Sequence, residues 1–588
     1  MNPLLSIFAL LILISCSSKK NQETSMKTIN QILDEYYEER LQYFPLEATQ
    51  IADPRYNDKL PADISDSYRE KLKSFFNKYL DAIASVDTSG INEQEKISYD
   101  VFKREMEIQL KGFEFKDNLM PVNQFWSMHL SFPVLGSGSG NQPFKTAKDY
   151  DDFIKRIDDY VAYNDTAIAN MRRGLKEGIT PPAILMEKVL PQLEGIFRND
   201  VKENVFYGPI KNFPAEFSDN EKSDFTTKYS EAIKNKIIPT YKKLYDFIKQ
   251  EYIPGCRKSA GISEIPNGRE YYNHLIKVWT TTDLSADEIF EIGQKEVARI
   301  RAEMESVMRE TNFKGDLKEF FHFIHNDKQF MPFKHDSDVI EAYRGIEARM
   351  QPQLKQLFNM VPKSKFEVRQ TEAFREVSAS AEYNQAAPDG SRPGIFYVPV
   401  LDPAKFNVVG MEDLFLHEAI PGHHYQISIQ QENDSLPKFR RFGWFGAYGE
   451  GWALYTESLG KELGLYKDPY QYFGSLSEEM HRAIRLVVDV GMHTKGWTRE
   501  QAIKFSLEND AESESDITAE IERYMAIPGQ ALAYKIGQLK ILEIRKQAKE
   551  KLGDKFSIKE FHDEVLRDGC LPLDVFEAKM KRWESSYN

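Results

Sequence analysis

The sequence predicts a mainly α-helical protein: a large two-lobed helical body with a small β-sheet beside the helix of a candidate site, and a deep central cleft. Apolar residues recur at helical spacing over most of the 588 residues. Strand-forming residues are confined to two short segments, and no long Gly/Ser or Pro-rich linker divides the chain. We therefore expect helical lobes around one cleft rather than a string of separate domains.

The predicted helices combine apolar residues at three- and four-residue spacing with Lys and Glu. They cover Thr28 to Tyr43, Ser67 to Ser85, Glu93 to Lys111, Lys148 to Lys176, Glu221 to Tyr252 and Ser285 to Glu310. Gly, Ser, Pro and Asn cluster between Gly261 and Asn267, which indicates a boundary. We expect an N-terminal helical lobe over residues 29–264 and a catalytic α+β lobe over residues 265–588, which contains HEAIPGHH and EGWALYTE.

The two predicted strands are Lys365 to Thr371 and Ile395 to Leu401. Pro399 cannot donate a hydrogen bond to a neighbouring strand, so the second segment is predicted to be an edge strand or a bulge. Its free edge would dock an extended peptide by strand addition, with Tyr397 contacting that peptide. An ordinary short hairpin that covers the helices is the alternative.

The segment His417 to Gln426, HEAIPGHHYQ, places three imidazoles and a carboxylate within ten residues. Neutral imidazole and carboxylate are the groups that a catalytic Zn²⁺ ion takes from protein, with one position left for water. Glu418, beside the first histidine, is the candidate general base for that water. The segment therefore predicts a site for one zinc ion.

Pro421 and Gly422 exclude the regular helix on which the two histidines of an H-E-x-x-H motif share a face. In a regular helix the Cα atoms of His417 and His424 would lie about 10.5 Å apart, too far to share one ion comfortably. A kink at the Pro-Gly pair would bring a later histidine back towards His417. His423 needs the smaller movement and is the preferred ligand, with His424 as the alternative ligand or as a partner of a ligand or substrate.

Glu450 and Glu457, in EGWALYTE, are the candidates for the third ligand, because they lie on one helix face two turns apart. The segment resembles EGFA-x-Y-x-E of zinc aminopeptidases, in which the first Glu completes the metal site. This resemblance assigns Glu450 to the metal and leaves Glu457 a structural role.

The chain resembles a bacterial family, domain of unknown function 885, in six segments between Asp389 and Leu573. These are DGSRPGIFYVPVLDP, LHEAIPGHHYQ, EGWALYTESLG, RAIRLVVDVGMHTKGWT, IPGQALAYKIG and FHDEVLRDGCLPL. The family includes lipoproteins and is distantly related to zinc metallopeptidases with a glutamate third ligand, the gluzincins. The resemblance implies a predicted peptidase with a metallopeptidase-like body and does not specify the substrate.

A predicted helix from His481 to His493 carries a polar stripe of Arg482, Arg485, Asp489 and His493 among Leu, Val and Ile residues. One interpretation is a structural ion-pair network, because buried charges need partners. In the other, the stripe faces the cleft and Arg485 holds the C-terminal carboxylate of a peptide. Asp489 or His493 would then orient a metal ligand or bond the substrate, with His493 a candidate partner of the developing oxyanion.

In the favoured mechanism His417, His423 and Glu450 hold zinc, and Glu418 takes a proton from water as it attacks a peptide carbonyl. Tyr534, by resemblance to tyrosines of zinc peptidases, would stabilise the oxyanion; a buried Tyr bonded to backbone is the alternative. Two rival functions are a zinc amidase or esterase for a non-peptide substrate, and a catalytically silent ligand-binding lipoprotein with a structural metal.

The first 16 residues look like a lipoprotein signal peptide, with an apolar run from Leu4 to Ile14 and a lipobox ending at Cys16. The run is too short to span a bilayer. We expect cleavage before Cys16, lipid on Cys16, and a flexible tether over residues 17–28. The protein would then be an exported bacterial lipoprotein on the periplasmic face or outer membrane, bound to the membrane by lipid only.

The net charge of −14 and pI near 5.5 argue against a nucleic-acid partner, which needs a concentrated positive surface. The expected partner is a peptide or peptide-like substrate. Cys256 and Cys570 would allow one disulfide, but neither has metal-ligand spacing.

Overall fold

The structure is a computed structural model that describes residues 27–198, 200–372, 376, 380–387 and 392–587. Helices dominate it, and one small sheet accompanies them, so the predicted mainly α fold with a small sheet is confirmed. The predicted signal peptide, the lipidation site Cys16 and most of the predicted tether lie outside the described residues.

The first helices form a layer with its own apolar cluster. They are α1 (Ile29–Tyr43), α2 (Pro45–Gln50), α3 (Asp66–Ala84) and α4 (Glu93–Gly112). Capping boxes at Thr28 and Asn92 satisfy the first amides of α1 and α4, which explains where these helices begin. Phe439, far along the chain, packs against this cluster, so the layer is tied to the segment that follows the HEAIPGHH motif.

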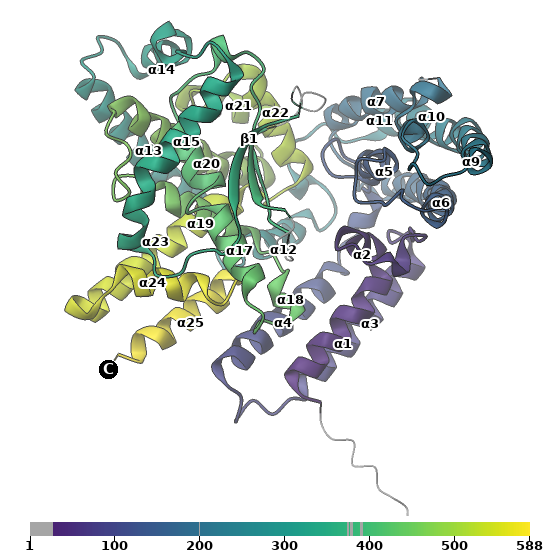
Figure 1. Ribbon diagram of the computed structural model, residues 1–588, viewed down its shortest axis with the longest axis horizontal. Helices are drawn as coiled ribbons and strands as arrows, with labels where there is room; N and C mark the ends of the chain where they lie inside the picture. The colour runs from purple at the N-terminus through teal and green to yellow at the C-terminus, as the bar shows by residue number, and fades with distance from the viewer. Residues whose placement is uncertain (1–26, 199, 373–375, 377–379, 388–391, 588) are drawn as a thin grey trace, which may run out of the picture.

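A second group of helices lies beside this layer (Figure 1). It comprises α5 (Met128–Gly136), α6 (Ala147–Glu177), α7 (Ala183–Phe197), α8 (Gly208–Lys211), α9 (Asp219–Ala232), α10 (Ile238–Phe247) and α11 (Ile253–Gly255). The helix predicted from Glu221 to Tyr252 is observed as α9 and α10 joined through a π-helical segment, Ile233–Ile237, and followed by a second one, Ile248–Tyr252.

The remaining helices surround the sheet and contain both motifs. They are α12 (Gly268–Thr280), α13 (Ala286–Glu310), α14 (Leu317–Asn326), α15 (Asp336–Leu357), α16 (Met411–Glu418), α17 (His423–Glu432), α18 (Lys438–Arg441), α19 (Gly446–Glu457), α20 (Pro469–Thr494), α21 (Arg499–Asn509), α22 (Glu514–Ala526), α23 (Leu532–Leu552), α24 (Ile558–Leu566) and α25 (Leu573–Ser585). Helices α19 and α23 pack backbone to backbone, because Gly451 and Gly537 face each other with no side chain between them.

The sheet contains β1 (Phe366–Gln370), β2 (Glu382–Asn384) and β3 (Gly394–Val398) in the order β1-β3-β2. Strand β3 is parallel to β1 and antiparallel to β2, so it is the central strand. The prediction of an edge strand at Ile395 to Leu401 is therefore wrong. Pro399 lies one residue beyond the end of β3, where its missing amide costs no ladder hydrogen bond.

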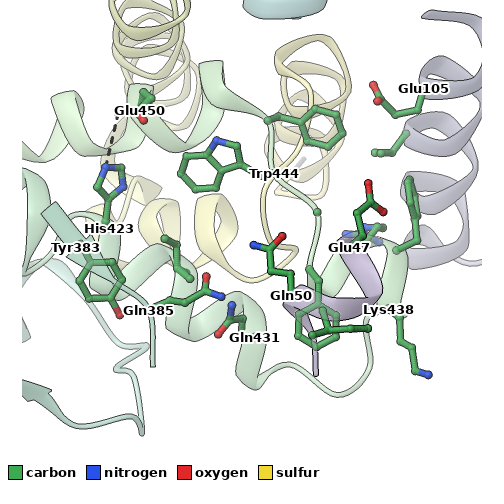
Figure 2. A pocket seen from close by; sticks show the side chains of 18 of the residues that line it. Glu47, Gln50, Glu105, Tyr383, Gln385, His423, Gln431, Lys438, Trp444 and Glu450 are labelled. Carbon is green, nitrogen blue, oxygen red and sulfur yellow. Dashed lines mark ion pairs between the residues drawn. The ribbon is translucent and has the colours of Figure 1, made fainter. Parts of the chain in front are cut away.

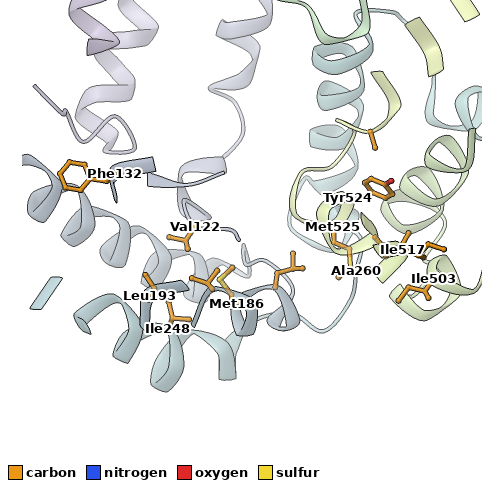
Figure 3. Packing of buried hydrophobic residues seen from close by; sticks show 14 of the residues in the cluster. Val122, Phe132, Met186, Leu193, Ile248, Ala260, Ile503, Ile517, Tyr524 and Met525 are labelled. Carbon is orange, nitrogen blue, oxygen red and sulfur yellow. The ribbon is translucent and has the colours of Figure 1, made fainter. Parts of the chain in front are cut away.

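The hydrophobic core does not divide at the predicted boundary near residue 264. The largest cluster runs from Leu60 to Ala531, and the second from Ile97 to Met580. Figure 3 shows one part of the first cluster, where Met186 and Leu193 lie in the α5–α11 group and Ile517 lies in α22. The two predicted lobes thus share buried apolar surface, whose removal from water stabilises their association.

Cys256 and Cys570 are both buried and free, so they form no disulfide. Among the described residues, every helix is too short or too polar to cross a bilayer.

Candidate metal centre and its cleft

The HEAIPGHH motif is folded as two helices joined by a tight turn. Helix α16 ends at Glu418, and α17 begins at His423. A Cβ atom on Gly422 would lie 1.9 Å from the carbonyl oxygen of His417, so only glycine allows the chain to fold back this closely. The predicted break at the Pro421-Gly422 pair is confirmed, and it turns the second histidine towards the first.

Helix α19 holds both sides of this turn. The indole of Trp452 donates to the carbonyl of Pro421, and the hydroxyl of Thr456 donates to the carbonyl of Leu416, each over 2.9 Å. All four partner residues are buried. These bonds fix α19, which carries Glu450 and Glu457, against the motif.

Three of the predicted ligands converge. The nearest ligand atoms of His417, His423 and Glu450 all lie within 4.8 Å of one another. Oε2 of Glu450 lies 3.6 Å from Nε2 of His417 and 3.7 Å from Nε2 of His423. Donors in a tetrahedral zinc site with bonds near 2.1 Å are about 3.4 Å apart, and the two Glu450 distances are close to this spacing.

Glu457 lies on the other side of the His417 ring. Its Oε1 is 2.7 Å from Nδ1 of His417, and both side chains are buried. Seven residues of helix separate Glu450 from Glu457 by about 10.5 Å, and the imidazole lies between them. A carboxylate on Nδ1 keeps the proton on that nitrogen, which leaves the lone pair of Nε2 free for a metal.

The carboxylates around His417 determine its protonation. Burial alone would lower the pKa of His417, but Glu450, Glu457 and Glu418 together raise it well above its ordinary value. Burial would likewise raise the pKa of Glu450, but His417 and His423 hold it well below its usual range. The pocket therefore combines negative charge with an imidazole, that of His417, which would lose a proton to solvent when a cation binds its Nε2.

Glu418, the predicted base, lies beside the three converging side chains. One carboxylate oxygen is 4.0 Å from Nε2 of His417, and the other accepts a 2.9 Å hydrogen bond from the backbone amide of Tyr383. Tyr383 belongs to β2, which is an edge strand of the sheet. The carboxylate is thus fixed between the ligand cluster and a strand edge.

These residues open into a cavity of about 1030 Å³, which is large for a small-molecule site. Figure 2 shows His423 and Glu450 on one side, Glu47 and Glu105 on the other, and Trp444 between them. The far wall comes from α1, α2 and α4, so the N-terminal helices complete the cleft. The cavity also exposes apolar side chains: Ile51, Phe442 and Trp444.

Two other predicted residues, Arg485 and Tyr534, line the same cavity. The guanidinium of Arg485 lies 4.6 Å from the centre of the Tyr534 ring. Tyr397 is buried in the central strand and is not part of the cavity lining, because β2 rather than β3 provides the edge.

The structure places the remaining candidates away from the ligand cluster. Nδ1 of His424 is 2.9 Å from the hydroxyl of Tyr383, and burial lowers the pKa of His424 to about 4. Asp489 accepts hydrogen bonds from Tyr272 and from the amide of Gly529. Neither His424 nor Asp489 lines the cavity.

Both ring nitrogens of His493 are bonded to backbone, with Nδ1 accepting from the amide of Ile262 and Nε2 facing the carbonyl of Tyr524. His493 is fully buried and outside the cavity lining. The predicted polar stripe on α20 is therefore divided: Arg482 and Arg485 face the cavity, whereas the last two members support the core.

The sequence analysis considered Glu457 as a third ligand but did not predict its place on Nδ1 of His417, and it did not single out Tyr383, which bonds Glu418, or Trp444, which lies beside His423. The spacing of Glu450 and Glu457 on one helix face was the available signal for the first. No sequence pattern marked the other two, because their positions depend on how separate segments pack.

Comparison with known proteins gives a family. A family described as "Bacterial protein of unknown function (DUF885)" matches residues 45–580 of this chain. No curated protein matches the chain.

Two solved structures share the fold. The crystal structure described as that of the putative lipoprotein from Colwellia psychrerythraea is 28% identical, with a TM-score of 0.85, and the match covers 95% of this chain and 99% of that one. A putative lipoprotein of unknown function from Shewanella oneidensis is 20% identical, with a TM-score of 0.76 and coverage of 94% and 100%. The second likeness concerns the fold alone.

Proposed function

This chain belongs to the bacterial DUF885 family, and we propose that it is a zinc-dependent hydrolase that cleaves peptide bonds with metal-activated water. One observation carries the proposal: His417, His423 and Glu450 present their donor atoms to one point, beside Glu418 and at the wall of a large cavity. Two imidazoles and one carboxylate are a donor set of catalytic zinc, which keeps a further position open for water.

Zinc held by these three side chains would polarise a water molecule and the carbonyl group of a substrate. Glu418 would accept a proton as the water attacks and return it to the leaving amine. The amide of Tyr383 orients the Glu418 carboxylate for this transfer. The Tyr534 hydroxyl, which lines the cavity, is proposed to donate to the developing oxyanion.

The strand edge supports a peptide as substrate. Ser380, Ala381, Glu382 and Tyr383 line the cavity, and among the described strands β2 pairs with β3 alone. An extended peptide placed along the open side of β2 would pass Glu418 and the ligand cluster. The Tyr383 amide is already bonded to Glu418, so the other main-chain groups of residues 380–383 would hold such a peptide, with little dependence on its side chains.

Metal analysis of single variants tests the site. The protein is stripped with a chelator, incubated with zinc and desalted before the metal is measured. We expect one zinc per chain in the wild type and in His424→Ala, and loss of zinc in His417→Ala and His423→Ala. His424 is the matched control because it adjoins His423 in sequence but lies outside the cluster. Equal zinc in the wild type and His417→Ala would exclude the proposed centre.

Activity is tested with a peptide library and Glu418→Gln. This variant should keep zinc and lose about 10²- to 10⁴-fold in turnover, the usual contribution of a positioned acid–base group. An active Gln variant would exclude Glu418 as the base. Cleavage of esters or non-peptide amides without cleavage of peptides would favour a zinc amidase or esterase over a peptidase. Zinc binding without any hydrolysis would favour a structural metal.

We also propose that the chain is an exported lipoprotein anchored through Cys16, in agreement with the description of both structural relatives. A Cys16→Ser variant should move from the membrane fraction to the soluble fraction. Mass spectrometry of membrane extracts that finds an intact Met1 would contradict this assignment.

A further inference from the structure

A cationic cluster on α20 and α22 forms part of the cavity wall. Arg485 and Arg523 both bond the carboxylate of Glu520, at 3.1 and 2.9 Å. His481 lies 3.6 Å from the same carboxylate and 2.7 Å from Asp510. Two guanidiniums thus share one carboxylate, while the imidazole has a carboxylate of its own.

Arg485 is the member of this cluster that lines the cavity. It is only 7% exposed; its Nε donates to Tyr524 and its Nη2 to Glu520, but Nη1 has no hydrogen-bond partner among the described residues. A buried guanidinium nitrogen without a partner is unfavourable, which suggests that a ligand supplies one. Stacking on Tyr534 fixes the plane of the group.

We propose that Arg485 binds the C-terminal carboxylate of the substrate, so that the protein removes residues from the C-terminal end of short peptides. The guanidinium is planar, and its unpaired Nη1 could donate to a carboxylate beside the Nη2 that is shared with Glu520. This inference rests on the proposed peptidase activity, because it places the carboxylate and the scissile bond in the same cavity.

The reaction has simple stoichiometry. The carbonyl carbon before the last residue gains the oxygen of one water molecule, and its bond to nitrogen breaks. Glu418 moves one proton from that water to the departing nitrogen. The products are a peptide shortened at its C-terminal end and a free amino acid. The rest of the peptide occupies the part of the cavity towards α1 and α2, where Arg40 and Glu47 already neutralise each other.

The test uses three peptides with blocked N-termini: N-acetyl-Ala-Leu-Phe, its C-terminal amide, and N-acetyl-Ala-Leu-Asp amide. We expect the zinc-loaded wild type to release free Phe from the first and to show about 10- to 100-fold lower kcat/KM on both amides, as for loss of a charge-assisted hydrogen bond. Equal hydrolysis of the first two peptides overturns the inference, while the proposed peptidase activity itself still stands. Equal hydrolysis of the first and third overturns it in favour of an acidic side chain as the ligand of Arg485.

Binding provides a second measurement that needs no turnover. Calorimetry with zinc-loaded Glu418→Gln should show tighter binding of the peptide with a free C-terminal carboxylate than of either amide. In the double variant that also carries Arg485→Met, the dissociation constants of the three peptides should lie within about twofold of one another. Arg523→Met, which removes a cation from the same cluster but not from the cavity lining, should keep the preference. Binding preference without hydrolysis would support the carboxylate site while the peptidase proposal fails. The absence of any preference would overturn the inference regardless of activity.

Discussion

Replacement of Glu457 by Gln isolates the contribution of the carboxylate behind the metal ligands. The change keeps the size of the side chain and removes the charge that faces Nδ1 of His417. The bond is 2.7 Å long, and the two residues are 2% and 6% exposed, so solvent screens it little. A hydrogen bond to a charged group contributes about 1.5 to 3 kcal/mol, which corresponds to about 10- to 100-fold in zinc affinity. That range agrees with the usual effect of changing a partner of a metal-bound histidine.

The zinc dissociation constant would be measured by competition with a chromophoric chelator at constant pH. Glu462→Gln, a change on a partly exposed carboxylate paired with Arg545, is the matched control and should leave the affinity unchanged. Thermal unfolding in excess chelator separates a loss of fold from a loss of metal. A dissociation constant within twofold of the wild type in Glu457→Gln would refute the reasoning, because it would show that this carboxylate does not prepare His417 for zinc.

Three further changes test the packing and the pH response. Gly422→Ala should abolish zinc binding, since its Cβ would meet the carbonyl oxygen of His417 at 1.9 Å; normal zinc content by metal analysis would contradict this turn. Gly537→Ala should lower stability by about 1 to 3 kcal/mol, because its Cβ would meet the carbonyl of Ala447 at 1.8 Å in the contact of α19 with α23. Gly195→Ala is the control, because Gly195 is also helical but has open space at the Cβ position, and this change should not lower the stability of the protein. Equal melting temperatures of Gly537→Ala and Gly195→Ala would refute the overpacking argument. Burial lowers the pKa of His493 to about 3, so the unfolded chain takes up its proton first and stability should fall as the pH drops from about 6.5 towards 3. His493→Gln should reduce that slope by up to about 1.4 kcal/mol per pH unit in urea titrations with chelator present, and an unchanged slope would exclude the assignment.

Local rules in the sequence determined the helices and singled out His417 and His423 among the converging donors, whereas Glu450 was chosen over Glu457 by resemblance to zinc aminopeptidases. Periodicity alone predicted Ser285 to Glu310, observed as α13 from Ala286, because an amphipathic repeat with a capping box needs no distant partner. The break at Pro421-Gly422 was equally local, since it follows from a missing amide and a missing Cβ. The preference for His423 over His424 matches the geometry, although ligand binding itself stays a prediction.

Only the tertiary structure decided which strand is the edge and which polar residues reach the cavity. Strand β3 became central because β2, a three-residue strand with little sequence signal, pairs beside it. On α20, Arg485 faces the cavity while His493, two turns later, is bonded to the backbone at Ile262 and Tyr524. Spacing along a helix specifies a shared face, but the neighbours that cover each turn of that face come from distant parts of the chain.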